Sequence, residues 1–172
     1  SGDGAGRDYI ADFNGAVRSG DTLVLTMPFY EGGNIEPYIS NSNLIDDAVD
    51  QDIDHRDDVI KAAKLSLVHD ILKGLQYMQE SDRQCVHHDF RAMNLFMDGN
   101  GKVVTGDFGT ISQGTRSPNV QDTPLSHSPE AARFLETGGN EPVTNRTDTF
   151  TGGRMALALF GRDILPSTFN AA

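Results

Sequence analysis

Two short polar motifs, joined by a strong turn signal, constrain the fold of this chain more than any other feature. Residues 87–94 read His-His-Asp-Phe-Arg-Ala-Met-Asn, and Asp107-Phe108-Gly109 begins thirteen positions after residue 94. Between them, two short β-prone runs flank Asn100-Gly101, a pair whose residues both accept positive φ. The pattern therefore predicts a β-hairpin that joins the first motif to the second.

The first motif fits the pattern H-x-D-x-x-x-x-N and the second fits D-F-G. On these residues, in this order and spacing, the chain resembles eukaryotic-type protein kinases of the serine/threonine branch, over roughly residues 8–172. The resemblance implies an α+β, protein-kinase-like fold with a mainly helical large lobe. Its β-hairpins would come from strands four and five and from the region of the catalytic loop. The resemblance also implies the cofactors ATP and Mg²⁺ and a protein substrate.

Asp89, Asn94 and Asp107 have the chemistry that phosphoryl transfer needs. We expect Asp89 to accept a hydrogen bond from a substrate hydroxyl and to align it with the phosphorus atom. Asn94 and Asp107 offer the hard oxygen ligands that Mg²⁺ prefers. Arg91 stands where serine/threonine kinases usually place lysine, and it could steady the transferring phosphate, although its planar fork differs from an ammonium group. A lone Asp or Asn in a loop usually serves a turn, but the joint spacing favours a site.

Residues 23–33 resemble strand five and the hinge that holds the nucleotide, with Met27 as gatekeeper. By that similarity, the carbonyl of Pro28 and the backbone of Tyr30 would meet the adenine edge. Proline is tolerable there because it keeps its C=O group. Asn34 is assigned to the same nucleotide site, and Phe96 is expected to close it under the adenine.

Three further rings fall where the family stacks its regulatory spine, although ordinary core packing explains them equally well: Phe13, His87 and Phe108.

Two later segments also resemble the family. Thr123-Pro124 with Ser128-Pro129-Glu130 resembles the substrate-docking loop and its A-P-E end, and Thr123 would bridge the catalytic aspartate and the basic residue. Asp148 resembles the aspartate at the start of the central helix, which secures the backbone of the catalytic loop. The same residue type is a good helix N-cap, so we expect it to begin that helix.

The first sixty residues predict strands, a short helix and a loop. Residues 8–17 and 23–27 are β-prone and flank Arg18–Asp21, which has the composition of a hairpin turn, so we expect two antiparallel strands. A short helix is expected near Ile35–Ile39. Residues 41–58 are polar and rich in aspartate, which favours a solvated loop.

Helical periodicity dominates the middle of the chain. Apolar residues recur at three- and four-residue spacing from Ile60 to Gln79 and predict a long amphipathic helix whose stripe forms the core. That stripe consists of Leu65, Val68, Leu72 and Leu75, with Ile71 and Met78 alongside. Residues 109–130 lack a sustained period, as an activation segment would, and helical spacing returns over residues 148–165.

The charge balance excludes several classes of partner. Among 172 residues, 14 are basic and 25 acidic, which gives a net charge of −11. Such a chain repels nucleic acid and anionic lipid surfaces. No apolar run approaches the roughly 20 residues that span a bilayer. Cys85 is the single cysteine and cannot form an internal disulfide, so we expect a reducing, cytoplasmic setting.

The positions of the lysines depart from the family. The chain holds only Lys61, Lys64, Lys73 and Lys102, so none precedes the helical middle to serve as the phosphate-pairing lysine of strand three. We therefore expect residues 1–27 to be a remnant of the small lobe, most of which is absent. Residues 28–172 would form a large lobe that is abbreviated at its C-terminus. The missing segment could be truncated, cleaved, or supplied by another chain or an activating partner.

His88 is a second departure. Many members of the family have arginine here, which pairs with a phosphorylated activation-loop residue, and a neutral imidazole cannot do so constantly. We therefore expect weak or no dependence on activation-loop phosphorylation. Small kinases with unusual basic positions resemble the effector kinases of pathogenic bacteria, which would place this protein in a host cytosol.

Two alternatives remain open at this point. A pseudokinase, which binds a partner without transfer, is favoured by the absent lysine and opposed by the intact Asp89, Asn94 and Asp107. A small-molecule phosphotransferase shares the first motif, but Phe108-Gly109 and the segment from Thr123 to Glu130 favour a protein substrate. The substrate, the organism, the regulation and the oligomeric state do not follow from the sequence.

Overall fold

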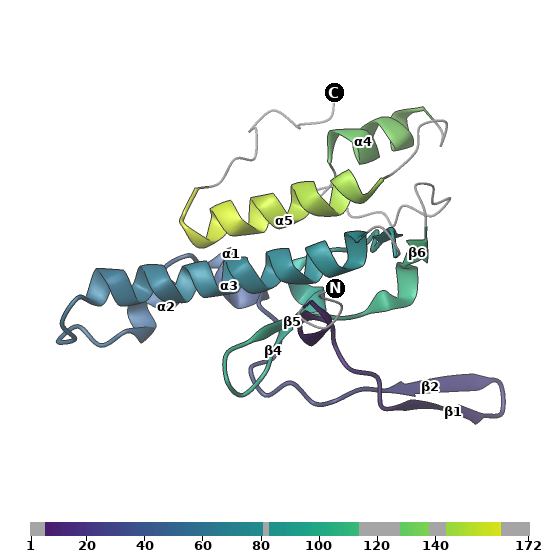
Figure 1. The fold of residues 1–172 in the computed structure, drawn as a ribbon, viewed down its shortest axis with the longest axis horizontal. Helices are drawn as coiled ribbons and strands as arrows, with labels where there is room; N and C mark the ends of the chain where they lie inside the picture. Colours follow the sequence, from purple (N-terminus) through teal and green to yellow (C-terminus); the bar gives the residue numbers. More distant parts are fainter. Residues whose placement is uncertain (1–5, 81–82, 114–127, 138–143, 163–172) are drawn as a thin grey trace.

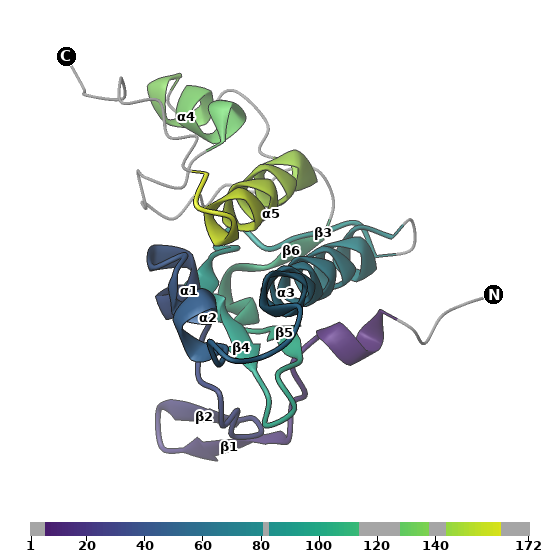
Figure 2. The ribbon, with the colours of Figure 1, turned by 90° about the vertical axis from the view of Figure 1, so that its left-hand side faces the viewer.

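The long helix α3 (Arg56–Gln79) organises the fold. This computed structural model describes residues 6–80, 83–113, 128–137 and 144–162. Helix α5 (Asn145–Leu159) packs along one side of α3, and a 3₁₀ turn (Arg7–Tyr9) with strand β5 (Val103–Thr105) packs on another side (Figures 1 and 2). The predicted long helix is thereby confirmed and begins four residues earlier than expected.

The buried face of α3 differs partly from the predicted stripe. Leu67, Ile71, Leu75 and Met78 are buried in the core, whereas Leu65 and Leu72 are 49% and 47% exposed. Helical residues follow one another at roughly 100°, so Leu65 lies about 200° around the helix from Leu67. The predicted core positions Leu65 and Leu72 were therefore wrong.

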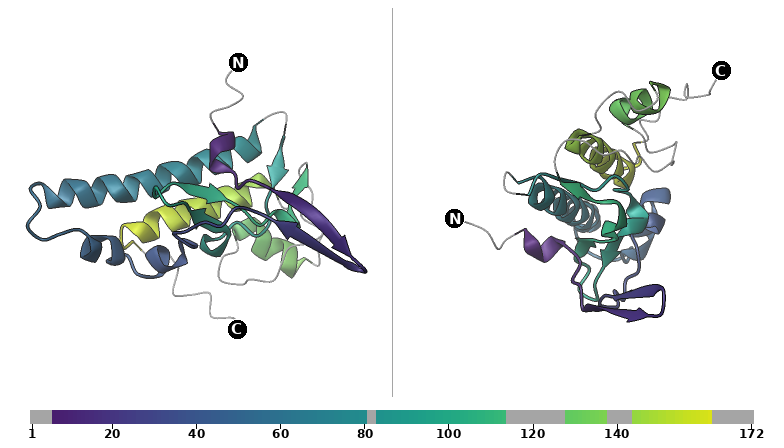
Figure 3. Two further views of the ribbon diagram at one scale, coloured as in Figure 1. Left: turned by 90° about the horizontal axis from the view of Figure 1, so that it is seen from below. Right: turned by 90° about the vertical axis from the view of Figure 1, so that its right-hand side faces the viewer.

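Strands β1 (Gly15–Ser19) and β2 (Thr22–Thr26) form an antiparallel hairpin, with Ser19 opposite Thr22 across a two-residue turn. Gly20 in this turn has φ +60°, a conformation that glycine adopts without strain. The first strand starts later than predicted, because the preceding backbone pairs elsewhere: the Ala11 N–H donates to the Thr105 carbonyl at 2.7 Å. The hairpin projects away from the helices (Figure 3).

The predicted hairpin between the two motifs is confirmed by strands β4 (Leu95–Met97) and β5. In the turn, Asp98 Oδ1 accepts hydrogen bonds from the N–H groups of Asn100 and Lys102. Gly101 has φ +80°. A third two-stranded sheet pairs β3 (Cys85–Val86) with β6 (Ser112–Gln113), so the chain before the first motif lies beside the chain after the second (Figure 2).

Two short helices precede α3. Helix α1 (Glu36–Ser40) agrees with the helix predicted near residues 35–39. Helix α2 (Leu44–Ala48) corrects the prediction that residues 41–58 form only a solvated loop. Ile45 is buried in the core, and Lys64 Nζ of α3 lies 2.5 Å from Asp46 Oδ1. Tertiary contacts therefore hold α2 in place. Its segment has too few apolar residues for a helix to be predicted from the sequence.

Helix α5 confirms the predicted C-terminal helix over residues 148–159 but begins at Asn145. Its N-cap is Thr144, whose side chain accepts a hydrogen bond from the Arg146 N–H, so the N-cap prediction for Asp148 was wrong. A Cβ on Gly152 would lie 2.6 Å from Leu75 Cδ1, so glycine permits the close approach of α5 to α3. Helix α4 (Pro129–Glu136) packs beside α5. Within the described ranges, no helix has both the length and the apolar character that crossing a membrane would require.

Candidate active site

The loop between β3 and β4 carries the first motif, and α5 holds its backbone. Asp148 Oδ2 accepts a hydrogen bond from the His87 N–H at 2.7 Å, and Oδ1 accepts from the His88 N–H at 3.3 Å. Asp148 is buried. The prediction that this aspartate secures the loop is confirmed, although it acts from the first turn of the helix and not from the cap.

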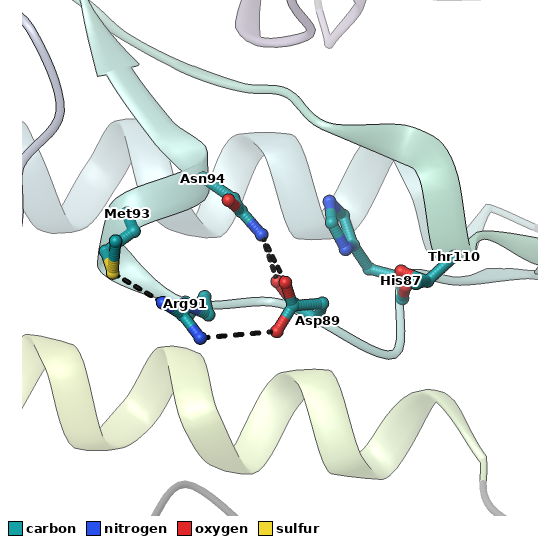
Figure 4. Close-up of polar contacts among 6 residues, drawn as sticks. All are labelled: His87, Asp89, Arg91, Met93, Asn94 and Thr110. Carbon is teal, nitrogen blue, oxygen red and sulfur yellow. Dashed lines mark hydrogen bonds and ion pairs between the residues drawn. The ribbon is translucent and has the colours of Figure 1, made fainter. Parts of the chain in front are cut away.

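Asp89 and Asn94 form the centre of the site. The Nδ2 group of Asn94 donates to Asp89 Oδ2 and to the Asp89 carbonyl, both at 2.8 Å. A short 3₁₀ turn (Ala92–Asn94) brings the two ends of the motif together. Figure 4 shows the amide nitrogen of Asn94 facing Asp89 while its oxygen points away. The predicted base and the first predicted metal ligand therefore share one hydrogen-bonded cluster.

Arg91 lies beside Asp89, as the sequence placed it. Its Nη1 atom is 3.9 Å from Asp89 Oδ1, and Nη2 donates to the Met93 sulfur (Figure 4). The guanidinium is thus held close to the carboxylate that the sequence assigns as the base. A phosphate approaching Asp89 would come within reach of a fixed positive charge.

Asp107 lies two residues after the end of β5 and begins the second motif. It is exposed, has φ +55°, and its Oδ1 accepts a hydrogen bond from the Gly109 N–H at 3.4 Å. Asn94 and Asp107 together offer an amide oxygen and an exposed carboxylate, which is the donor set that Mg²⁺ binds along with phosphate oxygens and water. These two residues therefore fit the metal that the family implies. No group of three or more His, Cys, Asp or Glu residues suited to a metal occurs among the described residues.

His87 links the two motifs from inside the core. It is fully buried, its Nε2 lies 3.0 Å from the Gly106 carbonyl, and its ring centre is 5.4 Å from that of Phe108. Phe90 adds an edge contact at 5.8 Å. The predicted contact of His87 with Phe108 is confirmed. Phe13 is 62% exposed, so its predicted place in the same stack was wrong. The segment around Phe13 leads into the β1–β2 hairpin, which projects away from the helices (Figure 3).

The predicted nucleotide residues lie on the segment that leaves β2. The rings of Tyr30 and Phe96 stack with centres 5.7 Å apart and planes 18° apart, and the Tyr30 hydroxyl accepts a hydrogen bond from the Asp12 N–H. Asn34 pairs with Phe96 in an isolated β-bridge. Met27 is exposed and Pro28 half-buried. The structure thus brings Tyr30, Asn34 and Phe96 together, while their contact with a nucleotide stays a prediction.

Burial shifts the pKa of two groups in opposite directions, His88 in the loop and Asp148 of α5 that holds it. Burial raises the pKa of Asp148 from 3.8 to about 6, although the hydrogen bonds from His87 and His88 and the charge of His87 act against this. Burial, reinforced by the neighbouring His87, lowers the pKa of His88 below 6.5. His88 is therefore neutral near pH 7, as the sequence suggested.

Sequence reasoning did not predict the contacts of two hydroxyl groups that follow the second motif. Thr110 Oγ1 donates to the His87 carbonyl at 2.7 Å, and Ser112 Oγ lies 2.7 Å from His88 Nε2. Their position directly after Asp107-Phe108-Gly109 was the available signal, but the pairing of β3 with β6 was not predicted. Thr123 lies outside the described residues. Ser128, predicted to end the docking loop, is buried, and its hydroxyl donates to Thr147 Oγ1.

Comparison with known proteins agrees with this geometry. Residues 5–157 match the family model for protein tyrosine and serine/threonine kinases. The chain is 24% identical over 148 residues to the serine/threonine-protein kinase CTR1 of Arabidopsis thaliana, which covers 84% of this chain and 16% of that protein. It is also 24% identical over 154 residues to the serine/threonine-protein kinase pakB of Dictyostelium discoideum. That match covers 87% of this chain and 16% of that protein.

A shorter match, 26% identical over 102 residues, relates it to the Arabidopsis serine/threonine-protein kinase PBL13 and covers 56% of this chain and 19% of that protein. The chain therefore spans less than a fifth of each of these relatives. The predicted family and fold are confirmed, and the three relatives agree with the predicted serine/threonine branch. By its two motifs, the hydrogen-bonded Asp89–Asn94 pair and the match over residues 5–157, this chain belongs to the protein tyrosine and serine/threonine kinase family.

Proposed function

We propose that this chain carries the phosphate-transferring half of an ATP- and Mg²⁺-dependent kinase that acts on serine and threonine hydroxyls of a protein substrate. The observation that carries the proposal is the Asp89–Asn94 pair at 2.8 Å, with Arg91 beside it. The similarity to three serine/threonine kinases supports the same branch. The single cysteine, Cys85, supports a reducing, cytoplasmic setting.

Asp89 is assigned as the base that orients the substrate hydroxyl. One of its oxygens is fixed by the Asn94 amide, so its carboxylate has one orientation relative to the loop. A carboxylate held in this way can accept a hydrogen bond from an alcohol and direct its oxygen toward phosphorus. Arg91 is assigned to bind the phosphate on the other side of the same carboxylate.

Asn94 and Asp107 are assigned as the ligands that would hold Mg²⁺. A bound Mg²⁺ would neutralise charge on the phosphates of ATP. Asp107 can serve because it is exposed and makes one long hydrogen bond within the described part of the chain, to the Gly109 N–H. Met27, Pro28, Tyr30, Asn34 and Phe96 are assigned to the nucleotide, which the stack of Tyr30 on Phe96 supports.

We further assign residues 1–27 to the small-lobe side of the site and residues 28–172 to the large lobe. The projecting β1–β2 hairpin supports this division. The positions of the lysines favour a second candidate, a binding module without transfer activity. Three lysines lie on α3, and Lys102 lies in the β4–β5 turn over the Tyr9 ring, so none extends from β1 or β2.

The test is transfer of labelled phosphate by a fusion of this chain to the small lobe of one of its serine/threonine relatives, which supplies a lysine. Peptides with serine or threonine should be labelled in a Mg²⁺-dependent reaction, and Asp89→Asn should abolish the label. A fusion that binds ATP and labels nothing would favour the binding module. Label on a small metabolite alcohol, with none on peptides, would favour a small-molecule phosphotransferase.

A further inference from the structure

His88 is held in an unusual backbone conformation from two sides. It has φ +66°, a region that non-glycine residues rarely occupy unless their surroundings hold them there. Asp148 of α5 accepts its N–H at 3.3 Å, and its ring nitrogen Nε2 lies 2.7 Å from Ser112 Oγ on β6. Ser112 stands opposite Val86 in the β3–β6 register, two residues before His88, so the sheet itself brings the hydroxyl within reach.

The surroundings of the ring select one proton arrangement. The other nitrogen, His88 Nδ1, is buried and has no hydrogen-bond partner among the described residues. A proton on Nδ1 would bury an unpaired donor, whereas a bare Nδ1 leaves only an unpaired acceptor. The ring is therefore expected to be neutral, with its proton on Nε2 donated to Ser112 Oγ. Burial and the nearby His87 lower the pKa of His88, which agrees with this arrangement.

We propose that His88 and Ser112 form a neutral latch that positions the catalytic loop, and with it Asp89, against the segment that follows Asp107. The inference rests on the proposed function. Thr110 supplies a second tie, because its hydroxyl donates to the His87 carbonyl at 2.7 Å. Both ties join neutral groups, so the loop and the segment after Asp107 are aligned without a phosphoryl group. This is a physical reason for the expected weak dependence on activation-loop phosphorylation.

The test uses the ¹⁵N-labelled full chain with Ser112→Ala, Ser112→Thr and, as a matched control, Ser19→Ala at the end of β1. In the wild type at pH 7, the ring nitrogen shifts of His88 should report a neutral imidazole protonated on Nε2. Ser112→Ala should remove that preference and speed amide exchange at His88 and Asp89 by roughly two- to tenfold, which corresponds to one net hydrogen bond. Ser112→Thr keeps the hydroxyl and should restore both, and Ser19→Ala should change neither.

An imidazolium or an Nδ1–H tautomer in the wild type would overturn the latch, as would unchanged exchange in a folded Ser112→Ala. If Ser112→Ala does not fold, the tautomer in the wild type decides. These readouts need neither nucleotide nor transfer, so the latch can stand if the proposed function fails. In the active fusion, Ser112→Ala should lower kcat at unchanged KM for ATP, and Ser112→Thr should restore kcat. Unchanged kcat would show that the latch does not position Asp89.

Discussion

The helical core and the β1–β2 hairpin use similar apolar side chains in opposite ways. Leu75 on α3 is 3% exposed and lies against α5, where a Cβ on Gly152 would meet it. Leu23 on β2 is 62% exposed, and Val17 and Leu25 are exposed to a similar degree. A two-stranded hairpin is marginally stable by itself and leaves its edges unpaired. The comparison indicates that the core buries its apolar side chains, whereas the hairpin has apolar surface without a partner among the described residues.

The two regions also divide the chemistry. Asp89, Asn94, Arg91 and Asp107 are all attached to the core, and Asp148 of α5 holds the loop that bears the first three. The hairpin leads only to the segment assigned to the nucleotide, from Met27 to Asn34. Transfer chemistry should therefore depend on the core directly and on the hairpin through nucleotide affinity.

The largest effect is expected from substitution of either of two carboxylates attached to the core, Asp89 and Asp107, which should differ in their effect on ATP binding. In the fusion described above, Asp89→Asn should lower the transfer rate by roughly 10²- to 10⁴-fold, because the substrate hydroxyl loses its base. Asp107→Asn should lower the transfer rate as well, but it should also weaken Mg²⁺-dependent ATP binding, which Asp89→Asn should spare. Calorimetric titration of both variants checks this. Equal ATP affinities in the two variants would contradict the assigned roles. Val17→Ala in the hairpin is the control, and it should leave the transfer step at Asp89 unchanged.

Two leucine truncations test the structural half of the comparison. Leu75→Ala should destabilise the chain by about 2–5 kcal/mol, because it leaves a cavity between α3 and α5. Leu23→Ala should change the free energy of unfolding by less than about 0.5 kcal/mol, because its side chain is already in water. Urea denaturation of both variants measures the difference. Similar losses would show that the hairpin is covered in solution, for example by a second copy of the chain.

The sequence predicted structure correctly where a short motif or a regular spacing has one main structural or chemical explanation. The spacing of residues 87–94 and 107–109, the Asn-Gly turn and the long helix led directly to β4, β5, α3 and the Asp89–Asn94 pair. The contact of Asp148 with the loop was predicted by resemblance and is present. For the hairpin, the helix and the Asp89–Asn94 pair, local conformation and spacing along the chain carry the information, whereas the long-range contact of Asp148 came from the resemblance alone.

The sequence was less informative where a contact depends on a partner far along the chain. Helix α2 is held by Ile45 in the core and by the pairing of Asp46 with Lys64, which no local pattern announces. Phe13 is apolar but exposed, and Leu65 and Leu72 share the spacing of the stripe but not its burial. Ser112 reaches His88 only because β3 and β6 pair, and two-residue strands have no readable period.

Asp148→Ala should have the next effect in size, because it removes a buried acceptor from the loop of the core. The N–H groups of His87 and His88 would lose their partner, which costs about 1–3 kcal/mol. Thermal and urea unfolding at pH 7.5 would measure this, with Asp57→Ala as the control, since Asp57 lies exposed in the first turn of α3. An unchanged stability and an unchanged transfer rate in the fusion would show that Asp148 does not hold the loop.

The smallest effect expected is a change with pH in how much Asp148 of the core contributes to the free energy of unfolding. The hairpin residue Leu23 should show no such change. Burial raises the pKa of Asp148 from 3.8 to about 6, so the folded state binds this proton more tightly than the unfolded state. Such a group contributes stability that is fully present below pH 3.8 and is lost as pH rises through about 6. The stability difference between wild type and Asp148→Ala should therefore grow by roughly 1–2 kcal/mol from pH 7.5 to pH 5. Urea denaturation at both values checks this, and the difference between wild type and Leu23→Ala should stay constant. A difference for Asp148→Ala that shrinks toward pH 5 would mean that its hydrogen bonds, and not its burial, set the pKa.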